Sequence, residues 1–452
     1  MIASRRILFL ALSGVRVCDP ELRKQGLTLP GFVERGRTIA EMPALGLLTL
    51  AGLCPEHWHA EYRELDAPLA PWGDFAAGIA EEQFDLVAIS ALTARINEAY
   101  ALADELKGCG VKVVLGGLHI SALPDEAAQH ADAIVVGEGE GPWTALLNDI
   151  EVGFLRPRYI ASEHQVAFDY SPVPRYDLLR SQRYNRIPLQ TQRGCPWHCE
   201  FCGASRTISA FKCKSADHIR RDLDAALSAV ERPFIELADD NTFADKKHGR
   251  SVVECMSSRN LHWFTETDIT VAKDEQLLDA LSGSGCVELL IGFESSQPRS
   301  LSGLDTHDFK LRSLDWQREA VQRIQSRGIG VNGCFIIGLD GDDENVFERT
   351  YNYVCELELA EVQITLPTPF PGTAFHRRLQ REGRLLRQPY WEQCTLFDVT
   401  FNPAKMSVDT LRTGFAWLME RLYNGEAAQR RKRLRSKLTR ARLGEKRGFA
   451  TN

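Results

Sequence analysis

The sequence predicts an α/β protein in which two domains built on parallel sheets are followed by a helical extension. Its 452 residues exceed what one core of ordinary size needs. Short apolar runs alternate twice with helix-length segments, which is typical of parallel strands covered by helices. After residue 385 this alternation stops. We therefore expect domains over residues 1–151, 186–385 and 386–452, with a linker over 152–185.

The first domain begins with the apolar run "ILFLAL", which we interpret as a buried strand. Two arginines precede it as in a signal peptide, but the run is short and no small-residue cleavage pattern follows. The later strands are "EYRELDA", "DLVAIS", "VKVVLGG" and "DAIVVGEG". Ligands of such a Rossmann-like fold bind beyond the carboxyl ends of the strands, where the turns "LGGLH" and "VGEGEG" fall.

The charge of the chain argues against a nucleic-acid partner. Fifty-four basic residues stand against 61 acidic ones, for a net charge of -7, so no overall basic field attracts polyanions. No segment is long enough to span a bilayer, and we expect a cytoplasmic protein. One segment differs from the overall acidic charge, the basic tail "RRKRLRSKLTRARLGEKR". We interpret it as a solvated helix, with contact to a membrane surface or a partner as the alternative.

The second domain follows a segment rich in proline and without a regular period, "RPRYIASEHQVAFDYSPVPRYDLL", which we interpret as the linker. Its candidate strands are "IPLQTQRG", "FIELADD", "HWFTETD", "VELLIGFE", "GVNGCFIIG" and "EVQITLPTPF". Six such units favour a (β/α)6 partial TIM barrel, whose chemistry takes place at the carboxyl ends of the strands.

The helical extension contains one clear amphipathic pattern, "SVDTLRTGFAWLMERLYNG". Ser407 is suited to cap the start of this helix and Gly425 to end it. Four apolar residues share one of its faces: Leu411, Phe415, Leu418 and Leu422. We expect a helical cap that docks on the second domain.

Three of the twelve cysteines cluster in "QRGCPWHCEFCGAS", where Cys195, Cys199 and Cys202 form a C-x3-C-x2-C pattern. A reducing compartment makes disulfides improbable. We interpret the nine scattered cysteines as small core residues: Cys18, Cys54, Cys109, Cys213, Cys255, Cys286, Cys334, Cys355 and Cys394.

An iron-sulfur cluster fits these three cysteines best. A structural zinc site needs a fourth ligand, normally in a second pair; no second pair is present, and His198 between two of the cysteines is badly placed to serve. A catalytic cysteine would need one thiolate only. A cubane held by three thiolates leaves one iron open to a substrate or cofactor. Cys213, at an irregular spacing downstream, is not expected to be a ligand.

The cysteine pattern, with an aromatic residue before its last cysteine and a place after the first barrel strand, resembles the radical S-adenosylmethionine (SAM) superfamily. The resemblance implies a 4Fe-4S cluster on Cys195, Cys199 and Cys202, with SAM chelating the fourth iron. Reduction of the cluster would cleave SAM to a 5'-deoxyadenosyl radical. An electron donor such as flavodoxin or ferredoxin is implied as a partner.

The resemblance continues through "ELADDNTF", "IGFES" and "CFIIGL". It implies contacts with the SAM amino group, ribose and adenine, and an aromatic wall beside the adenine. In that order the residues are Asp239 and Asp240, Glu294 and Ser295, Ile337 and Gly338, and Phe201. Taken singly, the acidic pair could cap a helix and "IIG" could be core. The segment "LPTPFPGT" resembles a signature of many cobalamin-binding members.

The first domain resembles the cobalamin-binding domain that precedes the barrel in one radical SAM subfamily. Glycine turns would let the backbone approach a corrin or its nucleotide tail. The expected cobalamin contacts are Ser90, Thr93, Gly116, Gly117, His119, Gly137, Glu138 and Gly139. The D-x-H-x-x-G motif of a cobalt-ligating histidine is absent, since Gly117 stands two residues before His119. We therefore expect His119 to touch the tail or brace the loop. A sheet that no longer binds cobalamin is the alternative.

The resemblance implies methylation of an unactivated carbon, with methylcobalamin supplying the methyl group. The whole-chain pattern is similar to members that act on lipids, tetrapyrroles and other secondary metabolites, hopanoid methylases among them. One rival is a radical dehydration, cyclisation or ring contraction without methyl transfer. Another is a non-catalytic cobalamin sensor, which would not need an open iron. A zinc-stabilised nucleic-acid-binding module conflicts with the acidic charge balance.

Overall fold

The computed structural model describes most of the chain, and it divides into two compact units. The first unit comprises Met1–Arg16, Arg37–Leu189 and Gly203–Pro233, and the second comprises Val17–Gly36, Gln190–Cys202 and Phe234–Asn452. The described residues are 4–14, 17–28, 42–65, 71–162, 168, 171–179, 184, 186–203 and 208–449. Two segments thus cross between the domains expected from the sequence: 17–36 groups with the second unit, and 203–233 with the first.

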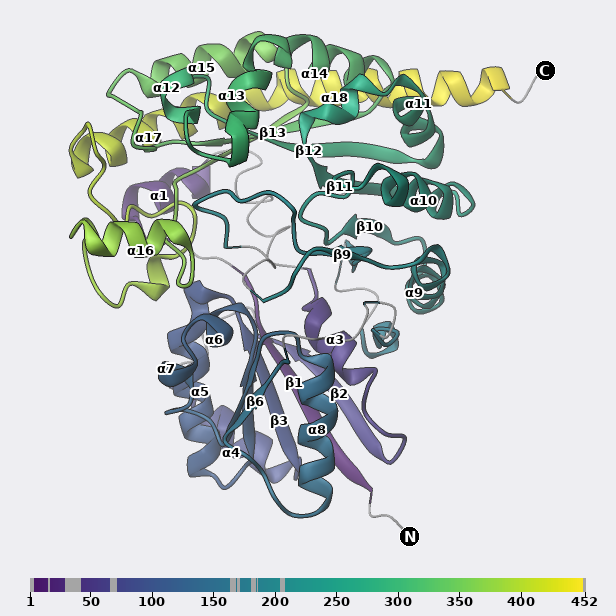
Figure 1. Cartoon of the computed structure of the whole chain (residues 1–452), viewed down its shortest axis with the longest axis vertical. Coiled ribbons are helices and arrows are strands. Elements are labelled where there is room, and N and C mark those ends of the chain that lie inside the picture. Colours follow the sequence, from purple (N-terminus) through teal and green to yellow (C-terminus); the bar gives the residue numbers. More distant parts are fainter. Residues whose placement is uncertain are drawn as a thin grey trace. The chain divides into compact units, whose positions relative to one another are not determined.

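The first unit contains a parallel six-stranded sheet in the order β2-β1-β3-β4-β5-β6 (Figure 1). Its strands are β1 (Arg5–Leu12), β2 (Trp58–Glu64), β3 (Leu86–Ala91), β4 (Val113–Gly116), β5 (Ala133–Val136) and β6 (Arg158–Ile160). The chain proceeds in opposite directions across the sheet on the two sides of β1. In open parallel sheets, this reversal point marks the ligand crevice, at the carboxyl ends of β1 and β3.

Helices cover both faces of this sheet, which is why residues 7–12 of its interior strand β1 are all apolar and buried. Alternate residues of β1, such as Phe9, pack into a core with Trp143 of α8 and Leu47 of α3. The residues between them, such as Leu10, are also completely buried and point to the opposite face. The helices around this sheet are α3 (Leu45–Ala51), α4 (Gly73–Glu81), α5 (Ile96–Gly108), α6 (Leu118–Ala122), α7 (Pro124–Ala127) and α8 (Glu140–Glu151). The first unit also contains α9 (Ala216–Ala229).

Strand β6 lies inside the segment that the sequence predicts to be a linker. It has three residues at the edge of the sheet, with Tyr159 buried between the exposed Arg158 and Ile160. So short a strand carries no detectable period. The linker expected over residues 152–185 therefore includes a short edge strand.

The second unit contains five parallel strands in the order β14-β13-β12-β11-β10. They are β10 (Phe234–Leu237), β11 (His262–Thr267), β12 (Cys286–Glu294), β13 (Gly330–Ile336) and β14 (Glu361–Thr365). With β7 (Ile187–Leu189), each of the six predicted strand segments contains a strand. The helices between them are α10 (Lys246–Ser257), α11 (Glu275–Ser284), α12 (Pro298–Leu301), α13 (Phe309–Ser313), α14 (Gln317–Ser326) and α15 (Val346–Leu357).

The two faces of this second sheet differ sharply. One face is apolar and buried, with Trp263, Ile291 and Phe335 almost inaccessible. Because side chains alternate along a strand, the residues between them project to the other face, and many of these are polar. They are Glu236, Glu266, Glu288, Asn332, Glu361 and Gln363. The polar face of this parallel sheet offers hydrogen-bonding groups to polar ligands.

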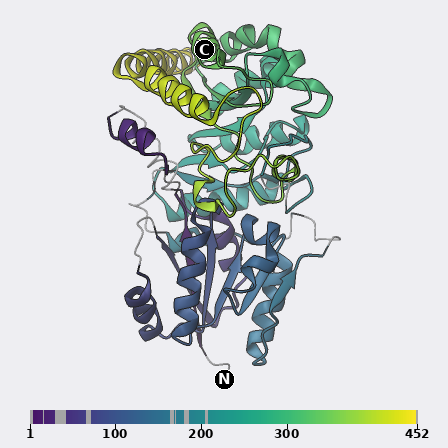
Figure 2. The ribbon, with the colours of Figure 1, turned by 90° about the vertical axis from the view of Figure 1, so that its left-hand side faces the viewer.

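Helix α16 (Ala374–Arg381) lies before the boundary expected at residue 385, and we group it with α17 (Val408–Tyr423) and α18 (Gly425–Phe449) as the extension. The Ser407 hydroxyl accepts a hydrogen bond from the Thr410 amide at 3.0 Å, which confirms the predicted N-cap. The predicted apolar face of α17 is buried. Figure 2 shows α17 and α18 as neighbouring helices beside the second sheet. Helix α1 (Pro20–Thr28) also packs against α17.

Helix α18 carries the basic tail, and one of its faces packs on the protein as far as Arg442. Arg431, Leu438 and Arg442 are buried, each only 7% exposed. Arg431 and Arg435 pair with Glu361 at 3.1 and 2.8 Å, and Arg442 donates to the Cys286 carbonyl. The interpretation of this segment as a solvated helix is therefore wrong for one face. Side chains after residue 442 lie outside the described residues.

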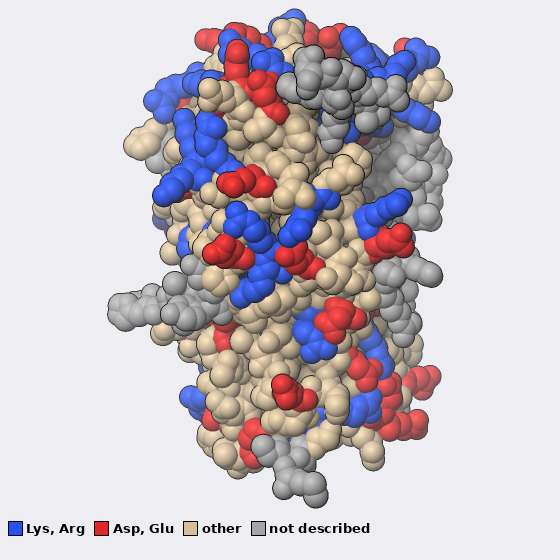
Figure 3. All heavy atoms as spheres, turned by 90° about the vertical axis from the view of Figure 1, so that its right-hand side faces the viewer, with Lys and Arg blue, Asp and Glu red and all other residues tan. Residues whose placement is uncertain are grey.

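The remaining expectations about the surface and the cysteines are met in part. Lys and Arg alternate with Asp and Glu over much of the face drawn in Figure 3. No helix in the described part of the chain has the length and hydropathy needed to cross a membrane. Cys255, Cys286 and Cys394 are buried as expected, but Cys18 and Cys109 are exposed, so the core interpretation is wrong for these two.

Replacing Arg431 by Met should lower the free energy of unfolding by about 2 kcal/mol, because Glu361 then keeps only one of its two cationic partners. Urea unfolding measures the change. Arg433→Met removes the same charge from an exposed position of the same helix and should have almost no effect. Equal unfolding midpoints for both variants would show that α18 is not held by this contact.

Candidate functional site

The three clustered cysteines share one loop of the second unit, directly after β8 (Gln192–Arg193). Their side chains are half-buried, and the Cys202 amide donates to the Cys199 carbonyl at 3.3 Å. Burial raises the pKa of Cys195 to about 11 and that of Cys199 to about 12, and the charge of Cys202 adds to both shifts. Cys202 is therefore near enough to both other cysteines for its charge to disfavour their thiolate forms.

Three cysteine thiols on one loop match the protein ligands of a 4Fe-4S cubane with one open iron. Among the described residues, no three His, Cys, Asp or Glu side chains converge on a point that one metal ion could occupy. In a cubane each thiolate binds a different iron, so the sulfur atoms stand further apart. Iron binding would also offset the thiolate repulsion and release the protons that burial otherwise retains.

Asp239 anchors the beginning of the cysteine loop. Its buried carboxylate accepts hydrogen bonds from the Thr191 amide at 2.8 Å, the Thr191 hydroxyl at 2.6 Å and the Gln192 amide at 3.0 Å. The Thr242 hydroxyl donates a fourth, at 3.0 Å. These donors occupy the Asp239 oxygens, so its geometry supports a positioning role and not contact with SAM. Asp240 is half-buried and close enough to Cys195 to affect the pKa of that thiol, and its contact with the SAM amino group remains a prediction.

Glu294 lies at the end of β12 in a left-handed conformation, with φ of 63°, where the pairing with β13 shifts register. Its carboxylate pairs with Lys310 Nζ at 2.8 Å, and Lys310 also donates to the Gly292 carbonyl at 2.7 Å. Burial alone would lower the pKa of Lys310, but Glu294 and then Cys199 outweigh it and raise the pKa. In turn, Lys310 counteracts the raised pKa of Cys199.

Lys310 is a site residue that sequence reasoning missed. It stands in α13, in "HDFKLRS", where nothing distinguishes it from a surface lysine. Its side chain is only 14% exposed. A backbone bulge held by a buried lysine next to a cysteine ligand is typical of strain retained at a functional site.

The turn after β13 contains Ile337 and Gly338, the predicted adenine contacts. Gly338 has φ of 103°, and the Gly338 and Leu339 amides donate to the Asp342 carboxylate at 2.9 and 3.0 Å. The Ile337 side chain is buried. Ser295, predicted for the ribose, is also buried, and its hydroxyl accepts a hydrogen bond from the Gln297 amide. Contacts of these residues with SAM remain predictions.

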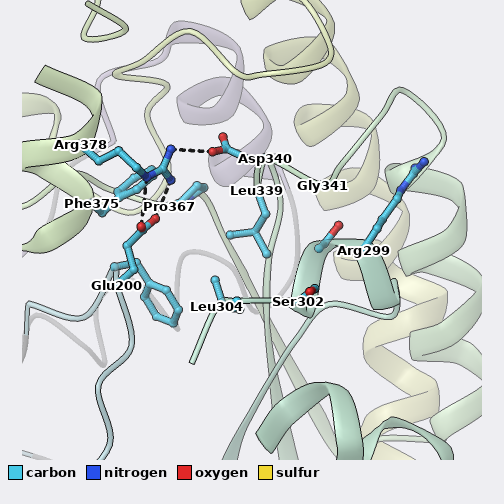
Figure 4. A pocket seen from close by; sticks show the side chains of 13 residues that line it. Glu200, Arg299, Ser302, Leu304, Leu339, Asp340, Gly341, Pro367, Phe375 and Arg378 are labelled. Carbon is cyan, nitrogen blue, oxygen red and sulfur yellow. Dashed lines mark hydrogen bonds and ion pairs between the residues drawn. The ribbon is translucent and has the colours of Figure 1, made fainter. Parts of the chain in front are cut away.

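Phe201 packs between two apolar clusters, one of which contains Ile336 and Leu339 and the other Phe375. Phe201 and Leu339 both line a cleft of about 170 Å³ (Figure 4). A cavity of about 150 Å³ can hold one benzene molecule, so this cleft has room for a flat ring system of modest size. The structure thus brings the predicted aromatic wall and the predicted adenine turn to one place.

In the first unit, His119 is 1% exposed and both ring nitrogens have partners. Nδ1 lies 3.4 Å from the Thr93 hydroxyl and Nε2 lies 3.2 Å from Glu126 Oε1. Its ring also makes an edge contact with Tyr100. This geometry suits a histidine that braces the loop after β3, not one that reaches a cobalt ion.

Two glycine turns meet beyond β4 and β5. Gly117 has φ of 116°, and Gly137 has φ of 83°. Ser121 ties them together, since its hydroxyl donates to the Gly117 carbonyl and accepts from the Gly137 amide, both at 2.9 Å. A Cβ atom on Gly117 would come within 3.1 Å of the Ser90 hydroxyl. At Gly139 the close neighbour would be Leu50, so that glycine serves helix packing.

Two large apolar side chains are exposed at the same edge of the first sheet. Leu92 follows β3 and is 44% exposed, and Leu118 begins α6 after β4 and is 40% exposed. Exposed apolar residues at the carboxyl ends of strands indicate a surface that binds an apolar ligand. Sequence reasoning missed them because both resemble ordinary residues of apolar segments.

Glu138 does not lie open to a ligand as predicted. Its carboxylate pairs with Lys212 Nζ at 2.6 Å and accepts from the Ser209 hydroxyl at 2.5 Å. The side chain is 6% exposed. Glu138 therefore fastens a later segment of the first unit to the end of β5, and the prediction that it binds cobalamin is not supported by these contacts.

Glu266 is an accessible carboxyl on the polar face of the second sheet. Enclosure by the protein and, second, the negative charges of Glu236 and Asp240 raise the pKa of Glu266 to about 8. The side chain nevertheless keeps exposed surface, so water screens part of this effect. Near neutral pH, Glu266 can hold a proton or release it.

Three protein families match this chain. The B12 binding domain matches residues 38–147, the radical SAM superfamily matches residues 189–354, and a domain of unknown function, DUF4070, matches residues 373–450. The matches follow one another in the order of the predicted domains. They confirm the resemblance and the α/β fold expected from it.

Curated relatives and solved structures agree with these families. The chain is 26% identical over 355 residues to bacteriochlorophyllide d C-12(1)-methyltransferase of Chlorobaculum tepidum, covering 77% of this chain and 76% of that protein. It is 25% identical over 358 residues to hopanoid C-2 methylase of Rhodopseudomonas palustris, covering 77% and 66%. The fold matches TsrM, a radical SAM methyltransferase from Kitasatospora setae solved with cobalamin and a [4Fe-4S] cluster. Its TM-score is 0.64 at 15% identity, covering 86% of this chain and 76% of that chain.

Glu266 gives a pH-dependent prediction. A carboxyl whose pKa is raised in the folded state stabilises the fold below its ordinary pKa of 4.5, and this stability is lost as the pH rises through about 8. Glu266→Gln should therefore become more stable than the wild type above pH 8, by about 1 kcal/mol after allowance for solvent screening. Urea unfolding of the cluster-free protein between pH 5 and 9 measures it. Glu344→Gln, at an exposed position, is the control, and parallel curves for all three proteins would contradict the prediction.

Proposed function

Because the chain belongs to the radical SAM superfamily and carries a B12 binding domain ahead of its radical SAM domain, we propose that it methylates a carbon atom of a small molecule. The observation that carries the proposal is the gathering of Cys195, Cys199 and Cys202 in one half-buried loop. In the same chain, the sheet of the first unit has glycine turns and exposed leucines at its ligand-binding edge. Both relatives described above are named for methyl transfer.

The enzyme uses a 4Fe-4S cluster, SAM and cobalamin. When bound, the cluster supplies the electron that cleaves SAM, and cobalamin carries the methyl group that is transferred. The cluster would be held by Cys195, Cys199 and Cys202. The three thiols fit it because they lie together without converging on a single-ion site. Leu92, Leu118 and the turn at Gly117 fit the broad, mainly apolar surface of a corrin.

The residues around the loop have separable roles in this proposal. Asp239 holds the first residues of the loop, and Lys310 places positive charge beside Cys199 while it fixes Glu294. Asp240 is the acidic residue placed to meet the SAM amino group. Glu266 would hold or accept a proton on the polar face of the sheet. Water access to a radical would be limited by the apolar packing around Phe201.

The substrate we propose is a tetrapyrrole, a lipid or a related secondary metabolite. One relative is named for a bacteriochlorophyllide and the other for a hopanoid. These two molecules have different carbon skeletons, but both are large and mainly apolar. We further propose a flavodoxin or ferredoxin as electron donor and a cytoplasmic location. The described part of the chain contains all twelve cysteines, each as a thiol, which suits a reducing compartment. Peripheral membrane contact would fall to the exposed cations of α18, such as Arg433 and Arg440.

Methyl-labelled SAM tests the proposed reaction. Anaerobically reconstituted protein with cobalamin, a reductant and extracts rich in tetrapyrroles or lipids should give a labelled product by mass spectrometry. Replacing Cys195, Cys199 and Cys202 together by Ala should abolish SAM cleavage, because the cluster loses its three protein ligands. Formation of 5'-deoxyadenosine without label in any product would favour the radical rearrangement alternative. SAM cleavage retained by the triple variant would overturn the assignment of the cluster.

Cobalamin binding tests the first unit separately. Leu118→Asp should weaken cobalamin binding at least tenfold, because a charge would face the apolar corrin surface. Val152→Asp is the matched control, since Val152 is 78% exposed in the same unit but lies away from the ligand edge. Absorbance titration measures both affinities. Equal affinity for the two variants would show that Leu118 does not line the cobalamin site.

A further inference from the structure

Helix α16 belongs to the extension, but it contacts the cysteine loop in three ways. The Phe375 amide donates to the Glu200 carbonyl at 3.0 Å. Arg378 Nε and Nη2 donate to the two carboxylate oxygens of Glu200, at 3.0 and 2.5 Å. Phe201 packs against Phe375 and Leu379. Since Glu200 and Phe201 lie between Cys199 and Cys202, these contacts fix the part of the loop that carries two of the three cysteines.

The same arginine also reaches the turn after β13. Arg378 Nη1 donates to Asp340 Oδ2 at 2.6 Å, and Asp340 follows Gly338 and Leu339 closely in the sequence. Arg384 holds the other oxygen of Asp340 at 2.7 Å. Figure 4 shows Arg378 between Glu200 and Asp340 at the rim of the cleft that Phe201 lines. One guanidinium thus joins the cysteine loop to the turn predicted to meet adenine.

The chemistry of this junction requires arginine. A guanidinium presents several donors in a rigid plane and can hold two carboxylates at once, whereas a lysine offers a single point charge. Glu200 is the largest cause of the raised pKa of Arg378, with Asp340 contributing. The amino-terminal end of α16 is capped, because the Thr373 hydroxyl accepts a hydrogen bond from the His376 amide at 3.1 Å.

We propose that Arg378 is a positioning residue that holds the cysteine loop and the turn after β13 at a fixed separation. In this way the helical extension sets how firmly the loop retains its cluster and how well SAM spans the cluster and the adenine turn. The inference rests on the cluster assigned above, and it does not depend on methyl transfer or on the substrate. The competing view is that these partly exposed ion pairs only add a little stability.

Four single variants separate the two views. Arg378→Gln removes the ion pairs of Arg378 with Glu200, Asp340 and its neighbour at the end of α16, Glu382. Glu200→Gln removes the charge on the loop alone, and Arg378→Lys keeps charge but can hold only one carboxylate well. Arg381→Gln is the matched control, because it removes the same charge from an exposed position of the same helix. The protein is the full chain after anaerobic reconstitution.

Three measurements are needed: iron loss to a chelator over time, the change in the electron paramagnetic resonance spectrum of the reduced cluster on addition of SAM, and the melting temperature of the cluster-free protein. Arg378→Gln should lose iron about tenfold faster, a typical effect of removing an outer partner of metal ligands, and should need more SAM to produce the spectral change. Glu200→Gln should lose iron faster with a smaller effect on SAM. Arg378→Lys should be intermediate, and Arg381→Gln should match the wild type.

The proposal is overturned if Arg378→Gln keeps the wild-type rate of iron loss and the wild-type response to SAM. It is also overturned if the melting temperature of the cluster-free Arg378→Gln protein falls far below that of Arg381→Gln, since Arg378 would then act on the fold as a whole. A wild-type protein that retains its cluster and responds to SAM but transfers no methyl group would refute the proposed function and leave this inference standing.

Discussion

The buried carboxylate of Asp239 is the interaction on which the candidate site depends. It lies just beyond β10 and binds Thr191 and Gln192, so the end of a strand and the start of the cysteine loop cannot move independently. Thr242 extends this network to Thr265 of β11. Burial raises the pKa of Asp239, and the hydrogen-bond donors around its carboxyl group offset only part of this rise. Breaking the hydrogen bonds of a buried group with this many partners costs considerable free energy. The first residues of the loop are therefore held rigidly.

The extension supports the same sheet from two ends. At the amino ends of the strands, Arg431 and Arg435 neutralise Glu361, which projects from the polar face. At the carboxyl ends, α16 ties the cysteine loop to the turn after β13. A sheet whose one face is polar cannot be stabilised by apolar burial on that face, so ionic partners from outside the strands are needed. This explains why helices that follow the last strand form part of the structure around the site.

Local patterns allowed the strands, the cysteine loop and the capped helix α17 to be predicted from the sequence, because each depends on residues close together in the chain. The partners of those elements could not be predicted. Arg378 lies 178 residues from Glu200, and Lys310 stands in an unremarkable helix. Glu138 was predicted as a ligand contact because it lies between two glycines, but Lys212 and Ser209 engage it. The three-residue β6 is too short to have a period, and the docked face of α18 is hidden by the many exposed cations around it.

The electrostatics of the loop indicate how its parts cooperate. Burial, with a contribution from the charge of Cys202, raises the pKa of Cys195 and of Cys199, so binding of iron must be coupled to proton release. The positive charge of Lys310 makes loss of the Cys199 proton easier. Lys310 is in turn held in its largely buried position by the ion pair with Glu294. Glu294 in turn depends on a strained backbone at the register shift between β12 and β13. Lys310 therefore links the strand that is predicted to meet the ribose with the thiol that is predicted to hold iron.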